Sequence, residues 1–149
     1  MGINSAGRVI QKYRIHWHLV LVHFPISFFM AAFGFQMLHL FLAADCFELA
    51  TNVALIAGAI MMIPTTWSGW NSWKKNYKSA HIMLFQRKIM TAFIMLGISI
   101  PLATWRSVFL GLFEQSHTTG EHVVYLIGNT LLIIGAIVEG YYGGRLNHR

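Results

Sequence analysis

Charged residues are scarce in this sequence. Asp, Glu, Lys and Arg make up 11% of its 149 residues, whereas apolar residues make up 56%. A soluble domain carries about 25% charged residues, because its surface must face water. The composition therefore argues against a soluble domain and predicts a surface that faces lipid.

Cysteine and the common catalytic motifs are also missing. The single cysteine, Cys46, cannot form an internal disulfide, and the absence of a C-x-x-C-H run excludes covalent c-type haem attachment. The sequence has no Gly-rich phosphate loop, no G-x-S-x-G, no H-E-x-x-H and no C-x-x-C pair. Its five acidic residues are scattered, which argues against paired acid–base catalysis.

Four long apolar segments are present, at residues 17–44, 48–67, 82–105 and 122–142. Each is near or above the ~20 residues that cross a bilayer core. We predict one all-α integral membrane domain over residues 1–149, a four-transmembrane-helix bundle. Outside the spans we expect an arm (1–16), a basic interfacial segment (70–80) and a tail (143–149).

Basic residues alternate between the connecting segments. They are frequent in the N-terminal arm, the second loop and the tail, and rare in the first and third loops. By the positive-inside rule, both termini are predicted to be cytoplasmic, in a multi-pass protein of the cell's inner (cytoplasmic) membrane. Because these charges flank apolar runs, we expect lipid and not nucleic acid as their partner.

All three prolines lie inside predicted spans. Pro25 leaves the carbonyl of Leu21 without its helical partner, and Pro64 and Pro101 have the same effect. Lipid cannot satisfy a free carbonyl, so neighbouring helices or side chains must do so. Small residues predict close helix contacts: Ala50, Ala54, Gly58, Gly128 and Gly135.

Histidines within the spans are the main candidates for chemistry, because polar groups in lipid are costly. By depth they form two pairs, His23 with His81 toward the cytoplasm and His39 with His122 toward the outside. Two facing imidazoles on different helices are what a low-spin haem b needs. We predict one haem b at the inner pair, with His23 and His81 as its metal ligands. The neighbouring Arg87 and Lys88 would contact its propionates.

Several alternatives stay open. His23 and His39 are separated by roughly 24 Å and about 160° around a straight helix, so a second haem at His39 and His122 is less simple. His16, one heptad before His23, is a rival ligand. A histidine here could instead be neutral and bonded to a carbonyl such as the one that Pro25 frees. Glu139 could pair with a nearby base or relay protons to a quinone.

The segment HLVLVHFPISF, His18–Phe28, resembles the first helix of an uncharacterised bacterial family of small integral membrane domains, domain of unknown function 2231. The match centres on the VHFP motif of residues 22–25, whereas Leu19 replaces a proline of the family pattern. Three further stretches are similar: TTWSGW at 65–70, WKKNYK at 73–78 and GYYGGRL at 140–146. Some members look like haem b proteins beside redox partners. The resemblance therefore implies four helices and electron transfer, with haem at His23 more clearly than at His81.

Three functional hypotheses follow. The first is a membrane haem b subunit without catalysis of its own, linking a quinone pool to an iron–sulfur, flavin or cytochrome partner. The second is a structural or assembly subunit of a membrane complex without a cofactor. The third is a metal or small-molecule transport protein with histidines as transient ligands, which the scarcity of cysteine and acid disfavours.

Overall fold

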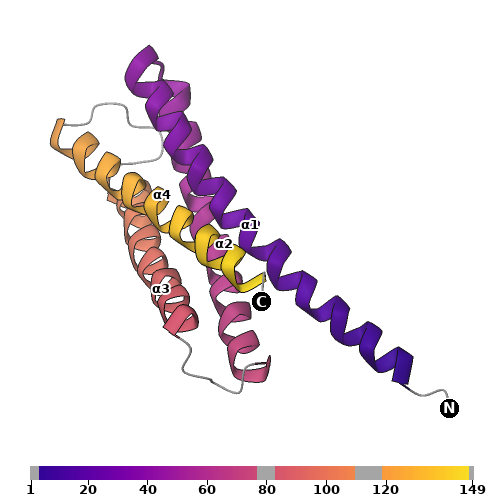
Figure 1. Ribbon diagram of the computed structural model, residues 1–149. Helices are drawn as coiled ribbons and strands as arrows, with labels where there is room; N and C mark the ends of the chain where they lie inside the picture. Colours follow the sequence, from indigo (N-terminus) through magenta and orange to yellow (C-terminus); the bar gives the residue numbers. More distant parts are fainter. Residues whose placement is uncertain (1–3, 77–82, 110–118, 148–149) are drawn as a thin grey trace.

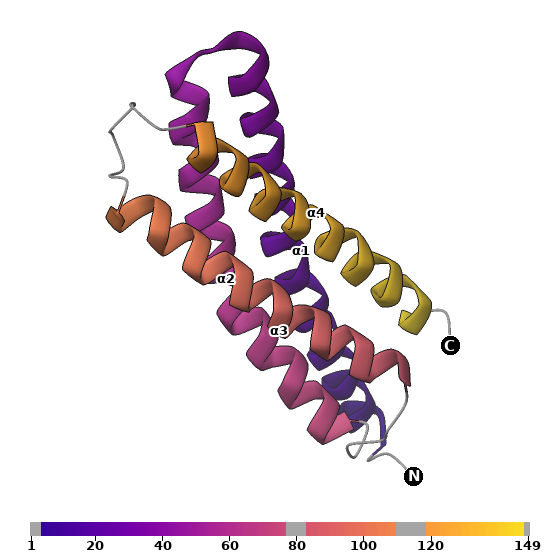
Figure 2. The same ribbon diagram turned by 90° about the vertical axis from the view of Figure 1, so that its left-hand side faces the viewer.

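The computed structural model describes residues 4–76, 83–109 and 119–147, and all regular secondary structure in them is helical. The elements are α1 (Asn4–Leu42), α2 (Asp45–Asn76), α3 (Met83–Thr104), the π-helical turn η1 (Trp105–Phe109) and α4 (Thr119–Asn147). Each helix packs on the next in sequence, and α4 closes the ring by packing on α1. The result is an up-and-down bundle (Figures 1 and 2). The N-terminal part of α1 projects beyond the other helices (Figure 1).

Four helices are long and apolar enough to cross a membrane, over Val20–Leu42, Asp45–Asn71, Gln86–Val108 and Gly120–Gly144. This finding confirms the predicted all-α class with four membrane-type helices. The helix α2 continues to Asn76, so it includes the first part of the expected interfacial segment 70–80.

Apolar side chains cover the outside of the bundle. Val53, Ile60 and Ile137 each expose more than half of their surface, at 56%, 59% and 66%. The interior, in contrast, contains fully buried amides at Asn52 and Asn129. Soluble monomers rarely expose large contiguous apolar patches. The distribution therefore suits a bundle surrounded by lipid.

A two-residue turn joins α1 to α2, and we call this part of the bundle the turn end. Ala43 has a φ of 48°, and its N–H donates to the carbonyl of His39 at 2.8 Å. A left-handed residue with this hydrogen bond is a common way to end a helix. Asp45 and Glu48 follow in the first turn of α2, where the helix dipole favours negative charge. The turn fixes where the carbonyl of Ala44 lies beside α1.

The carbonyl freed by Pro25 has a partner on a neighbouring helix, as predicted. Pro25 is buried in α1, and the Thr65 hydroxyl of α2 lies 3.1 Å from the Leu21 oxygen and 2.7 Å from the Met61 oxygen. One hydroxyl hydrogen is shared between these two acceptors. The arrangement joins α1 to α2 near the opposite end of the bundle from the turn.

Three glycines make close helix contacts. A Cβ added at Gly58 would lie 2.6 Å from a ring carbon of Phe29, and one at Gly128 would lie 2.5 Å from Leu102. At Gly135 it would lie 2.7 Å from Met95. The predicted packing seams are therefore confirmed at these three positions.

Gly58→Ala should destabilise the bundle by about 1–3 kcal/mol, because the Phe29 ring is buried and cannot move aside without disturbing the core. The measurement is reversible unfolding in detergent. Gly34→Ala is the matched control, since its new methyl group would meet nothing within 4 Å. Equal effects of the two substitutions would contradict the packing at Gly58.

Candidate functional site

The structure leaves His23 on the outside of the bundle. Its side chain is exposed on α1, and within the described ranges no hydrogen bond or ring contact joins it to another side chain. His81, its expected partner, lies outside the described residues. At the start of α3, Arg87 is exposed and Lys88 is half-buried.

The outer pair of histidines does come together. The rings of His39 on α1 and His122 on α4 have their centroids 6.0 Å apart and their planes at 28°. Both side chains are partly buried at the turn end. Their shared depth on the first and last spans was sufficient to predict this proximity.

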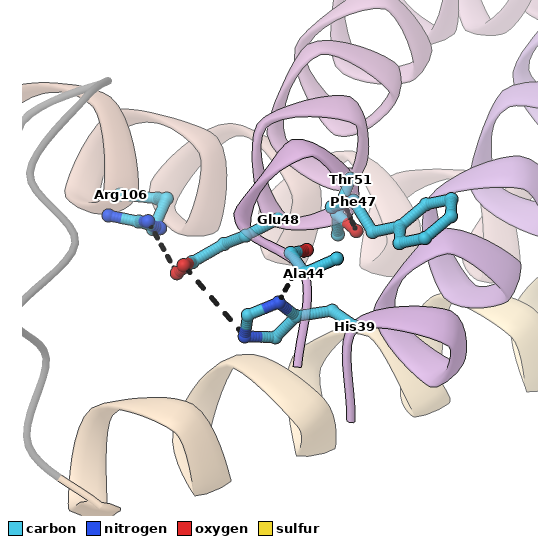
Figure 3. Close-up of polar contacts among 6 residues, drawn as sticks. All are labelled: His39, Ala44, Phe47, Glu48, Thr51 and Arg106. Carbon is cyan, nitrogen blue, oxygen red and sulfur yellow. Dashed lines mark hydrogen bonds and ion pairs between the residues drawn. The ribbon is translucent and has the colours of Figure 1, made fainter. Parts of the chain in front are cut away.

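A backbone carbonyl fixes the orientation of His39. Its Nδ1 lies 3.1 Å from the oxygen of Ala44, and because a carbonyl can only accept, Nδ1 is the donor. The other ring nitrogen, Nε2, lies 3.9 Å from Oε2 of Glu48 (Figure 3). That distance is too long for a hydrogen bond. The ring is thus tied at one nitrogen and faces a carboxylate with the other.

A buried ion pair lies next to His39. Arg106, in the π turn η1, donates from Nη2 to Oε1 of Glu48 at 2.6 Å, and the two side chains are only 4% and 11% exposed (Figure 3). The guanidinium also lies 6.0 Å from the ring centroid of Tyr125, within range of a cation–π contact. We call the five residues that meet here the polar end cluster: His39, Glu48, Arg106, His122 and Tyr125.

A second polar contact lies deeper in the bundle. Asn129 of α4 donates to the side-chain oxygen of Gln36 of α1 at 2.8 Å, and both residues are buried. Next to it is a pocket with room for about one water molecule. Its lining comes from three helices: Gln36, His39, Leu40, Glu48, Thr51, His122 and Tyr125.

Sequence analysis missed the central ion pair. Glu48 and Arg106 each lie at the end of an apolar segment, where hydropathy assigns charge to loops and interfaces. One sequence feature could have predicted the pair: the two residues carry opposite charges and lie at the same end of consecutive spans. The positions of His122, Tyr125 and Asn129 on one helical face gave a further signal, since residues three and four apart are neighbours on a helix.

Glu139 is buried in α4, near the opposite end of the bundle, at 6% exposure. Lys88 lies close to this part of α4. Its Nζ is 3.6 Å from the position that a Cβ would occupy if one were added to Gly143. No ion pair within 4 Å joins Glu139 to any base among the residues that the structure describes. The expected pairing of Glu139 with a nearby base (Arg145, Arg87 or Lys88) therefore stays a prediction.

The two ends differ in how well they suit a haem. At the turn end, Nε2 of His39 faces a carboxylate and the pocket holds about one water, so these residues as packed do not fit a macrocycle. We assign no haem to His39 and His122. At the opposite end, the imidazole of His23 is accessible and has the donor chemistry of an axial ligand. In the described part of the chain, no group of three or more His, Cys, Asp or Glu could hold a metal ion.

Comparison with known proteins adds no relative. No protein-family model, no curated protein and no solved structure matches this chain. The likeness around the VHFP motif thus stays a prediction, and function has to be argued from the chain's own residues.

Arg106→Met should lower the free energy of unfolding by about 3–5 kcal/mol, because it leaves Glu48 buried without its cation. Adding Glu48→Gln should recover part of that loss, since neither charge then remains. A double-mutant cycle measured by unfolding in detergent tests this coupling. Lys74→Met, at an exposed site on α2, should change stability by about 0.5 kcal/mol or less. Additive effects of the two cluster substitutions would contradict the pair.

Proposed function

We propose that this chain is an integral membrane electron-transfer subunit that binds haem b at the end opposite the turn, with His23 as one axial ligand. The observation that carries the proposal is the exposed imidazole of His23 inside the candidate span Val20–Leu42. An imidazole facing lipid is costly, and polar residues within spans are functional candidates by default. A cofactor or partner that covers His23 would remove this cost.

The ordinary structural role for His23 is already filled by another residue. A histidine beside a membrane proline could serve the freed carbonyl, here that of Leu21. The hydroxyl of Thr65 donates to that carbonyl instead, from the neighbouring helix. His23 is therefore left available for a ligand from outside the described residues.

The surroundings suit the negative groups of a haem. Arg87 and Lys88 begin α3 at the same end of the bundle as His23, where they could pair with propionates. His81, outside the described residues, supplies the second ligand in this proposal. When bound, haem iron carries one electron at a time by alternating between its ferric and ferrous states. Electron exchange then requires a quinone or a partner redox subunit at this end.

The proposal includes the orientation in the membrane. The spans are placed in the inner membrane with both termini and the α2–α3 connection on the cytoplasmic side, as the distribution of basic residues favours. Both ends of the described chain lie away from the turn end along the bundle (Figure 1), which is compatible with this topology.

A second function rests on the same face of α1. His23 and Phe24 are both exposed, and the N-terminal part of α1 projects beyond the other helices (Figure 1). A structural or assembly subunit could use this face to dock another membrane protein without a cofactor. The absorption spectrum separates the two functions.

The protein purified from haem-replete cells should be red, with a Soret band that sharpens and shifts on addition of dithionite. His23→Ala should abolish this band, because it removes an iron ligand. His122→Ala is the matched control and should keep the full band, since that histidine lies at the turn end. Size-exclusion chromatography checks that both variants stay folded. A colourless wild-type protein, or an unchanged spectrum of His23→Ala, would overturn the haem assignment.

The single cysteine allows a test of the topology that begins with the unsubstituted protein. Cys46 is exposed at the start of α2, so it should react with a membrane-impermeant maleimide applied from outside intact spheroplasts. The double substitution Cys46→Ser and Lys74→Cys moves the thiol to an exposed site near the other end of α2. That variant should react only after the membrane is opened. The reverse pattern would place the termini outside.

A further inference from the structure

The middle of the chain carries bases but no acids. Residues 49–113, which include most of α2 and all of α3, contain no Asp or Glu. At the turn end, Arg106 of this stretch has Glu48 as its partner. At the opposite end, no carboxylate in the described part of the chain lies within 4 Å of the charged groups of Lys74, Arg87 or Lys88. These bases are therefore available to an anion from outside the chain.

Aromatic rings position one of these bases. Nζ of Lys74 lies 5.1 Å from the ring centroid of Trp70, one turn earlier in α2, within range of a cation–π contact. The Trp70 ring is packed in turn against Trp73, with centroids 5.3 Å apart, and against Phe93 of α3, with centroids 6.0 Å apart. We call these four residues the Lys74 cluster.

The Lys74 cluster is prepared to bind an anion. A ring contact occupies one side of the ammonium group and leaves N–H donors that can face an anion. Lys74 is exposed, so these donors can be reached from outside the bundle. Because the side chain is already restricted by the Trp70 ring, it loses less conformational entropy when an anion binds.

The depth of the cluster suits a lipid headgroup. The candidate span Asp45–Asn71 ends three residues before Lys74, about 4.5 Å along the helix. Tryptophan rings and basic side chains favour this level of a bilayer, where the lipid phosphates lie. On the side toward the middle of the bundle, Phe93 and Ile94 are 49% and 50% exposed, so acyl chains would meet an apolar surface.

We propose that the Lys74 cluster binds one anionic phospholipid between the ends of α2 and α3. The ammonium of Lys74 donates to the lipid phosphate, and the acyl chains lie along Phe93 and Ile94. A zwitterionic lipid carries a cation of its own beside the phosphate, so it binds less well here. The site uses neither His23 nor the bases assigned to the haem propionates, and it is therefore independent of the haem proposal.

Native mass spectrometry of the whole protein tests this site, with phosphatidylglycerol and phosphatidylcholine of matched chains supplied in equal amounts. The wild type should retain phosphatidylglycerol in preference. Lys74→Gln should lower the ratio of bound phosphatidylglycerol to phosphatidylcholine about five-fold, as expected for one base near an anionic surface. Lys74→Arg keeps the charge over the ring and should keep most of the preference. No preference in the wild type, an unchanged ratio in Lys74→Gln, or an equal loss in Lys74→Arg would overturn the proposal.

Arg8→Gln is the matched control. It removes the same charge from the projecting part of α1, away from Trp70, and should leave the ratio unchanged. A loss as large as that of Lys74→Gln would show only a general attraction of basic residues to anionic lipid, and no site. Inorganic phosphate in excess should not displace the lipid, because the acyl chains also contribute to binding. Displacement would overturn a lipid as the occupant. Size-exclusion chromatography checks that each variant stays folded.

Discussion

The need to satisfy every polar group inside an apolar medium governs this bundle. Three polar contacts inside the bundle join different helices: Thr65 bonds the backbone of α1, Asn129 bonds Gln36, and Arg106 bonds Glu48. Each of these contacts joins two helices at a defined height. Because hydrocarbon offers no substitute partner, the contacts specify how the helices are rotated and aligned as well as adding stability.

The same constraint makes the two ends of the bundle chemically different. The turn end gathers a buried ion pair and two partly buried imidazoles in a small cluster. The opposite end leaves an imidazole on the surface, where nothing within the described residues bonds it. The cluster has room for about one water molecule and suits stability, whereas an exposed imidazole suits contact with another molecule. This contrast is why we propose a ligand-binding role for His23 and not for His39.

Hydropathy and composition were enough to predict four apolar helices, and the small residues predicted the close contacts at Gly58, Gly128 and Gly135. The need for a partner at the Leu21 carbonyl was also predictable, but its identity as Thr65 was not, since it depends on how α2 is rotated. A helix that is apolar on all sides has no marked inward face. For that reason the sequence alone could not show that His23 faces outward. The Glu48–Arg106 pair depends in addition on the π turn, which has no clear signature in the sequence.

The turn between α1 and α2 has an effect beyond reversing the chain. Because Ala43 adopts a left-handed conformation, the next carbonyl lies where it can accept from His39. A backbone torsion thereby selects which tautomer of an imidazole is present one turn earlier in the chain. The protonation pattern of this side chain is thus encoded in loop geometry, so a change in the loop could alter the chemistry of the cluster without replacing any of its members.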